Sequence, residues 1–213
     1  MKYHFILILL MGLGISDAFA QTSEAAVKLL DEVSENIAGY KNLTFDFTYV
    51  LENRLENIKQ ETEGSVTVAG NKYKLFFLGN EQLFDGQKTY TIVPENEEIT
   101  ISSPDEEEDF GINPSKLLNF YKEGYDYQWD IQQSVFGRPI QFVKLIPSSE
   151  NQDVNYLLLG IDLNRKSIYR LIEIGKNGTR TTLTLSNEAT NTPLSENFFT
   201  FDASTYPDYY INN

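Results

Sequence analysis

The sequence contains no cysteine, and its single histidine and both methionines fall at His4, Met1 and Met11. The absence of cysteine excludes disulfides, thiol nucleophiles and thiolate metal ligands. If the N-terminal segment that contains His4 is removed, the remaining chain has no imidazole either. That excludes a Ser-His-Asp triad and a histidine metal site. Carboxylates are abundant, so a hydrolase that uses paired acids stays open, although no pair of acids stands out by its spacing.

The N-terminal residues have the pattern of a secretory signal peptide. Lys2 and His4 precede an apolar run over residues 5–11, and Ala18-Phe19-Ala20 supplies a small-residue cleavage site before Gln21. The apolar run is too short for a membrane span, and no cysteine follows it to carry a lipid anchor. We therefore expect a signal peptide at residues 1–20 and one mature domain at residues 21–213.

The formal net charge is −14 and stays at that value after cleavage, because Lys2 and Asp17 cancel. A strongly acidic chain repels nucleic-acid phosphates and anionic headgroups. We therefore expect no nucleic-acid partner.

Residues 83–102 show the period-2 alternation of a half-buried hairpin. Tyr90 and Ile92 alternate with threonines, a charged turn follows at residues 94–98, and Ile99 and Ile101 then alternate with polar residues. Asn177-Gly178 between two further alternating runs predicts a type I′ turn. The same reasoning predicts strands at 43–52, 56–69, 73–78, 125–131, 140–146, 155–162, 167–174 and 181–185.

Two segments have helical spacing. Residues 23–40 form an amphipathic stretch with Ser23 as N-cap and Gly39 as stop, and residues 114–124 form a shorter, notably apolar one. The acidic segment at 103–112 lacks the ligand order of a calcium loop and is typical of a solvated connection. No βαβ alternation occurs. The fold class is therefore α+β and mainly antiparallel β, a curved half-open barrel of about 11 strands covered by helices.

Many bulky rings share one predicted face of this sheet, and only two helices are available to pack against them. One interpretation is an ordinary filled core; the other is a cavity for an apolar ligand. The candidate cavity wall comprises Phe45, Phe47, Tyr49, Val66, Val68, Tyr73, Leu75, Phe77, Tyr90, Ile92, Ile99, Ile101, Trp129 and Ile131.

Four stretches carry a resemblance to a known family over nearly the whole mature chain, in their order and spacing. They are AAVKLLDEVSENIAGYKNLTFDFTY, GSVTVAGNKYKLFF, LFDGQKTYTIVPENEEITI and FFTFDASTYPD. Together they resemble the outer-membrane lipoprotein carrier (LolA) family. The hairpin GKNGTRTTLTL and the tail PDYYIN are most similar to its Bacteroidetes-type members.

The resemblance implies a LolA-like half-open barrel with a helical lid, acting as a periplasmic chaperone without cofactor or enzymatic activity. Its implied partners are triacylated lipoproteins, an inner-membrane ABC lipoprotein-releasing complex and an outer-membrane receptor, and we expect a monomer. The alternative is a general lipid-binding protein or lipoprotein sensor of the same fold. The implied lid residues are Leu117, Leu118, Phe120 and Tyr121.

One position departs from the family. Better-known members carry an arginine at the start of the third strand, where it holds the lid, whereas this chain has Ala69-Gly70-Asn71 with only lysines nearby. Arg170 alternates with Ile168 and Ile172, which predicts one shared face. Arg170 could replace the missing group if it pointed inward, but we expect it to point outward in a salt bridge.

Overall fold

The computed structural model describes residues 23–103, 114, 118–149 and 153–212. The predicted signal peptide, nearly all of the acidic connection at 103–112 and the lid residue Leu117 lie outside the described residues.

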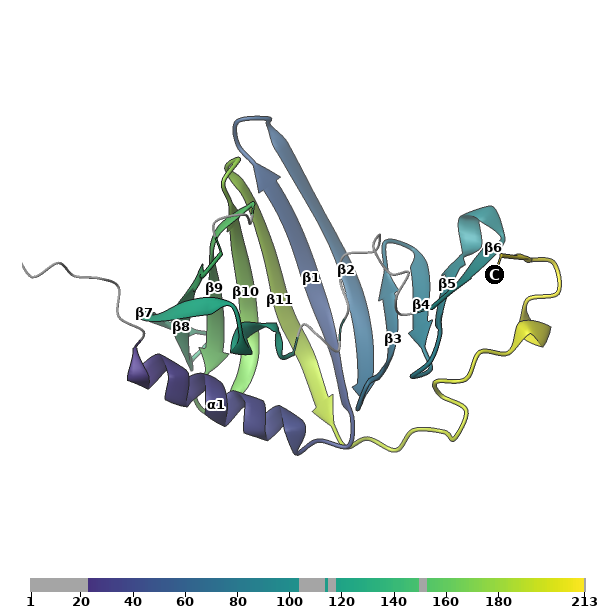
Figure 1. Cartoon of the computed structure of the whole chain (residues 1–213), viewed down its shortest axis with the longest axis horizontal. Helices are drawn as coiled ribbons and strands as arrows, with labels where there is room; N and C mark the ends of the chain where they lie inside the picture. The colour runs from purple at the N-terminus through teal and green to yellow at the C-terminus, as the bar shows by residue number, and fades with distance from the viewer. Residues whose placement is uncertain (1–22, 104–113, 115–117, 150–152, 213) are drawn as a thin grey trace, which may run out of the picture.

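One twisted sheet dominates the described structure and runs in the order β12-β6-β5-β4-β3-β2-β1-β11-β10-β9-β8-β7 (Figure 1). Every neighbouring pair is antiparallel except β12 and β6, which are parallel. This confirms the expected curved, half-open and mainly antiparallel architecture. The strands are β1 (Leu43–Asn53), β2 (Ile58–Ala69), β3 (Lys72–Phe77), β4 (Asn80–Phe84), β5 (Thr89–Val93), β6 (Glu98–Ser102), β7 (Tyr125–Val135), β8 (Arg138–Pro147), β9 (Val154–Asp162), β10 (Ser167–Gly175), β11 (Thr179–Thr190) and β12 (Tyr210–Asn212).

The two faces of the sheet differ in what covers them. Phe45 of β1 lies opposite Val66 of β2, which lies opposite Leu75 of β3, and directly paired residues project to the same side. We call the side that carries these three residues the inner face, and the opposite side the outer face. The main hydrophobic core joins the inner face to helix α1 (Glu24–Ala38).

Helix α1 forms where the sequence predicts it. The Ser23 side chain accepts a hydrogen bond from the Ala26 backbone N–H at 3.4 Å, and Gly39 caps the other end. One helical face is buried in the main core; it comprises Ala26, Leu29, Leu30 and Val33. In Figure 1 the helix runs across the lower ends of the strands from β7 to β11.

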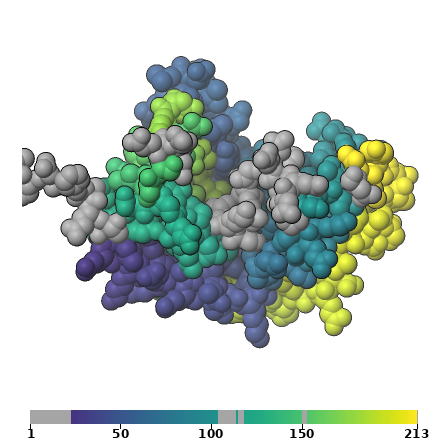
Figure 2. Space-filling view, viewed as in Figure 1, coloured from purple at the N-terminus to yellow at the C-terminus, as the bar shows by residue number. Residues whose placement is uncertain are grey.

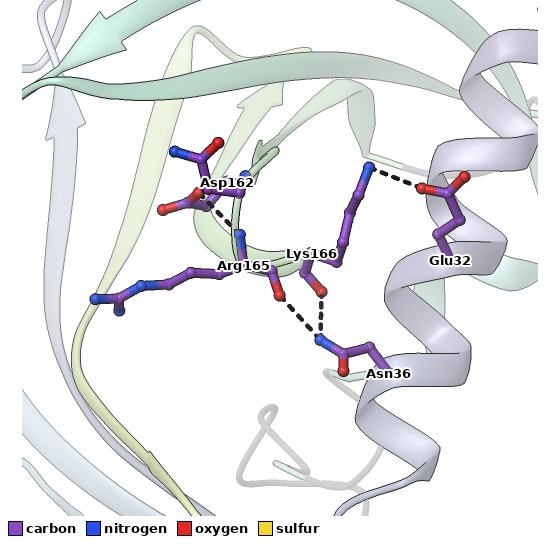
Figure 3. Close-up of polar contacts among 6 residues, drawn as sticks. Glu32, Asn36, Asp162, Arg165 and Lys166 are labelled. Carbon is purple, nitrogen blue, oxygen red and sulfur yellow. Dashed lines mark hydrogen bonds and ion pairs between the residues drawn. The ribbon is translucent and has the colours of Figure 1, made fainter.

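Polar contacts fix α1 against the turn between β9 and β10 (Figure 3). The Asn36 side-chain amide donates to the carbonyls of Arg165 and Lys166, both at 3.0 Å. Lys166 Nζ lies 2.7 Å from Glu32 Oε2. The Asp162 carboxylate accepts from the Arg165 backbone N–H at 3.2 Å and thereby holds the turn that presents both carbonyls.

Two local predictions need correction. In the loop between β10 and β11 only Gly178 has positive φ (81°), and its N–H bonds to the Gly175 carbonyl at 3.1 Å. This is a type I turn with a glycine bulge, not type I′, because three residues rather than two separate the strands. In the predicted helix over 114–124, Pro114 is helical, whereas residues 118–119 form a turn and Phe120–Lys122 a 3₁₀ helix instead of a continued α-helix. The C-terminal segment ends in strand β12.

Candidate functional site

The inner face of β1, β2 and β3 gathers eight of the predicted wall residues. By pairing register they form continuous rows across the three strands, for example Val68 beside Tyr73. The register follows from the strict alternation of each strand, which places every second side chain on one side. Six are at most 8% exposed and two are half-buried against them; in full they are Phe45, Phe47, Val66, Val68, Tyr73, Leu75, Tyr49 and Phe77.

Aromatic contacts organise the upper part of this wall. The Phe77 ring lies 5.4 Å, centroid to centroid, from both Phe47 and Tyr49. Gly64 makes this arrangement possible, since a Cβ there would lie 2.3 Å from Phe47 Cζ. The absence of a side chain at Gly64 therefore lets the Phe47 ring approach β2 closely.

Four predicted wall residues, Tyr90, Ile92, Ile99 and Ile101, lie on the other side of the sheet, and their assignment to the inner face is wrong. Tyr90 pairs with Leu83, which pairs with Lys74, one position out of phase with the inner-face Tyr73. Period-2 alternation shows that a strand is half-buried but does not say which face of the sheet the apolar side joins. On β5 the inner positions are taken instead by Thr89 and Thr91, both buried.

The C-terminal segment covers this outer apolar patch (Figures 1 and 2). The Phe201 ring stacks on Tyr90 at 4.5 Å, and Tyr206 stacks on Phe201 at 5.9 Å. The segment then enters β12, which extends the sheet beside β6. Tyr90 therefore lies beneath the tail, and Ile92 and Ile99 on the same face are buried.

Trp129 and Ile131 lie on β7, at the edge of the sheet, and are 46% and 57% exposed. Trp129 pairs with the inner-face residue Val143, which places it on the predicted face of the sheet. The register then shifts between Trp129 and Gln132. The buried Gln141 amide stabilises this bulge by donating to the Asp130 carbonyl at 2.7 Å. The bulge interrupts the alternation that the sequence pattern assumed for Ile131.

The described lid residues dock on the main core. Leu118 is 5% exposed and Tyr121 is fully buried, and Phe120 packs half-buried beside them. The Phe120 ring meets Tyr125 of β7 edge-on at 6.0 Å. The segment therefore lies against the inner face together with α1.

Tyr121 joins the segment to both α1 and β7. Its backbone carbonyl accepts a hydrogen bond from the Tyr127 hydroxyl at 2.6 Å. Its own hydroxyl lies beside that of Ser34 on α1, but both hydroxyls are buried without a well-formed hydrogen bond among the described residues. Burial raises the pKa of the Tyr121 phenol to about 12.

Arg170 points outward, as expected, and so does not supply the lid-holding arginine that the resemblance to LolA implies. Its Nε donates to the Thr184 hydroxyl at 3.0 Å, and its guanidinium lies over the Tyr169 ring at 5.0 Å. Among the described residues it forms no ion pair, contrary to the expected salt bridge. A register irregularity between Ile168 and Arg170 places Ile168 in the inner core, so the predicted shared face is wrong for that residue.

Glu173 is an acid on the inner face, and the sequence pattern did not indicate it as a candidate site residue. It pairs with Leu157 and Thr181, and burial raises the pKa of its carboxyl. Its spacing of two residues from Leu171, which belongs to the inner core, is the signal that could have placed it. Within the described ranges no group of three or more acids could hold a metal ion.

No family model matches the sequence, and no curated protein matches it. Among solved structures, an uncharacterized conserved protein from Thermus thermophilus is 13% identical with a TM-score of 0.56, covering 88% of this chain and 98% of that one. LprF from Mycobacterium bovis is 15% identical with a TM-score of 0.48, covering 82% and 97%. A LolA superfamily protein from Nitrosomonas europaea is 12% identical with a TM-score of 0.44, covering 83% and 97%. The Thermus structure shares the fold, and at this identity the likeness concerns the fold alone.

Proposed function

We propose that this protein is a periplasmic carrier of the LolA type, close to the Bacteroidetes members, which shields lipoprotein acyl chains between the inner and outer membranes. The observation that carries the proposal is the inner face of β1 to β3. Apolar side chains there form a continuous wall, and the same core includes residues of a short segment, 118–122, of little regular structure, which contacts α1 and β7. The sequence resemblance supplies the class of ligand.

The wall suits an acyl chain because it is broad and apolar. Phe47, Tyr49 and Phe77 form its upper part, and Leu75 and Val66 continue it downward toward the end covered by α1. An acyl chain of about 15 methylenes gains about 0.8 kcal/mol per buried methylene, so about 12 kcal/mol opposes its exposure to water. A protein that carries it must offer a comparable apolar surface.

In the proposed cycle Leu118 and Tyr121 occupy the wall when no ligand is bound, and the acyl chain takes their place. Two features lower the free energy needed to move these two side chains out of the core. The buried hydroxyls of Tyr121 and Ser34 regain water when the segment leaves, and a buried hydroxyl without a partner costs about 1–3 kcal/mol. The hydrogen bond from the Tyr127 hydroxyl to the Tyr121 carbonyl can be replaced by hydrogen bonds to water.

The partners proposed are triacylated lipoproteins, an inner-membrane ABC lipoprotein-releasing complex and an outer-membrane receptor. We propose a binding role without catalysis, and a monomeric carrier. The second candidate is a general lipid-binding protein or lipoprotein sensor of the same fold. It would use the same inner face, so it differs in ligand and partner rather than in site.

Lipoprotein release tests the proposal. Purified protein without residues 1–20 is added to spheroplasts of its own host, and the supernatant is examined for triacylated lipoproteins in complex with it. Release in a one-to-one complex, lost in Phe47→Asp, supports the carrier. Binding of a free fatty acid without release would support the general lipid-binding alternative. A protein that binds neither would contradict both.

A further inference from the structure

A cleft of about 530 Å³ opens where β3 ends beside β2, and residues from both faces of the sheet line it. Its lining includes Asp46, Glu63, Phe76, Leu78 and Asn187. Register places Asp46, Glu63 and Phe76 on the outer face, since Asp46 pairs with Ser65 and Ser65 with Phe76. The volume falls within the range of about 300–1,000 Å³ that is typical of small-ligand sites.

Unequal strand lengths create the cleft. The end of β3 at Phe77 pairs with Gly64, whereas β2 continues from there to Ile58 without a neighbour on that side among the described strands. In Figure 1 the β1–β2 hairpin correspondingly rises well above β3 and β4. The β3–β4 turn therefore lies against the side of a taller wall.

One side of the cleft is anionic. Asp46 and Glu63 are diagonal neighbours across the β1–β2 pair, a separation of about 7 Å. Asn187 donates its amide to Asp46 Oδ2 at 2.7 Å, which orients the carboxylate but leaves its charge uncompensated. Among the described residues neither acid forms an ion pair, and the nearby Lys74 is held by Glu81 at 2.7 Å.

The other side is apolar and exposed. Phe76 is 46% exposed and Leu78 is 66% exposed. Leu78 has φ 53°, and with Gly79 at φ 79° it forms a two-residue turn that normally takes asparagine, aspartate or glycine at the first position. A left-handed leucine costs about 1–2 kcal/mol, and such strain is characteristic of functional positions.

We propose that this cleft binds a primary ammonium or guanidinium group carried on an aliphatic stem, as in a lysine or arginine side chain. The cation lies between the carboxylates of Asp46 and Glu63, and the stem packs on Leu78 and Phe76. Lys74 Nζ already lies 5.6 Å from the centre of the Phe76 ring, so the carboxylates hold the cation and the apolar side chains hold its stem. Phe47, Gly64 and Phe77 of the inner face also line the cleft. The inference nevertheless does not rest on acyl binding, because Asp46, Glu63 and Phe76 lie on the outer face.

The test uses the mature protein and two short fluorescent peptides of glycine and serine, one with a single central lysine and one with norleucine in its place. We expect the lysine peptide to bind at least tenfold more tightly at low salt. Asp46→Asn with Glu63→Gln should abolish that difference. Glu61→Gln, a neutralised acid on the outer face of the same strand that does not line the cleft, is the matched control and should preserve it.

Hexylamine and hexanol, added as competitors, identify the source of the cation. Displacement by hexylamine but not by hexanol supports ammonium recognition, and hexylamine binding as tightly as the peptide would assign the cleft to small free amines. Equal binding of the two peptides, or full binding by the double variant, would overturn the proposal. Binding of a fatty acid by the double variant should stay unchanged, which separates this result from a failure of the carrier function.

Discussion

The Phe47 ring occupies the space that a side chain at Gly64 would need: a Cβ at position 64 would lie 2.3 Å from Phe47 Cζ and 2.6 Å from the Phe76 carbonyl oxygen. The aromatic end of the inner wall therefore depends on a glycine in the neighbouring strand. Neither residue can change without affecting the other.

Gly64→Ala should displace Phe47 and strain β3. We expect a loss of about 1–3 kcal/mol in the free energy of unfolding, as for overpacked cores, measured by urea denaturation. Affinity for a fatty acid should fall in parallel. Gly39→Ala is the matched control, since Gly39 has φ −75° and its nearest contact would be 3.4 Å away. Equal stability of the two variants would contradict the close approach of Phe47 to β2.

Tyr121→Phe should change the alkaline stability of the protein. The folded state holds the Tyr121 proton up to about pH 12, because burial raises the pKa of its phenol, whereas the unfolded chain releases it near 10. The unfolded state therefore loses its proton first, so stability is complete below pH 10 and falls as pH rises toward 12. The variant should show a smaller fall over this range. If Tyr121→Phe and the wild type lose stability equally between pH 10 and 12, the Tyr121 hydroxyl is exposed to water.

At neutral pH, Tyr121→Phe and Tyr127→Phe should change the free energy of unfolding differently. Tyr121→Phe removes a buried hydroxyl without a good partner and should be neutral or stabilising. Tyr127→Phe removes the donor of the 2.6 Å bond to the Tyr121 carbonyl and should cost about 1 kcal/mol. Thermal unfolding of both variants measures the difference. A larger loss in Tyr121→Phe than in Tyr127→Phe would refute the assignment of these roles.

Asn36→Ala should loosen α1 from the β9–β10 turn. Two carbonyls lose their donor, and we expect a loss of about 1–2 kcal/mol in the free energy of unfolding. Glu32→Gln removes an exposed ion pair with Lys166 and should cost clearly less, because water and salt screen such pairs. The reverse order would show that the ion pair, rather than the amide, anchors the helix.

Phe201→Ala should destabilise the protein by about 2–4 kcal/mol without changing acyl binding. The Phe201 ring stacks on Tyr90, on the face opposite the proposed acyl wall. Chemical denaturation and fatty-acid titration on the same variant separate the two properties. If the folded variant binds the fatty acid more weakly, Tyr90 belongs to the ligand-binding face.

The sequence predicted local structure well and the assignment of faces less well. The hairpin at Thr89–Val93 and Glu98–Ser102 forms as expected, because its alternation and turn residues are local signals. The face that its isoleucines join depends on the register of β3, β4 and β5 and on a C-terminal tail distant in the chain, which local patterns do not encode. The bulge at Asp130 was likewise hidden, because it rests on the buried Gln141 of another strand.

Site-specific photo-crosslinking of a captured lipoprotein shows which face of the sheet holds the acyl chains. A photoreactive phenylalanine analogue replaces Phe77 on the inner face in one variant and Tyr90 on the outer face in another. Each variant is loaded with a lipoprotein carrying radiolabelled acyl chains and irradiated. If the acyl chains bind the inner face, crosslinks form from position 77 and none from position 90. Crosslinks from position 90 alone would contradict binding to the inner face, because the acyl chains would then lie beneath the C-terminal segment.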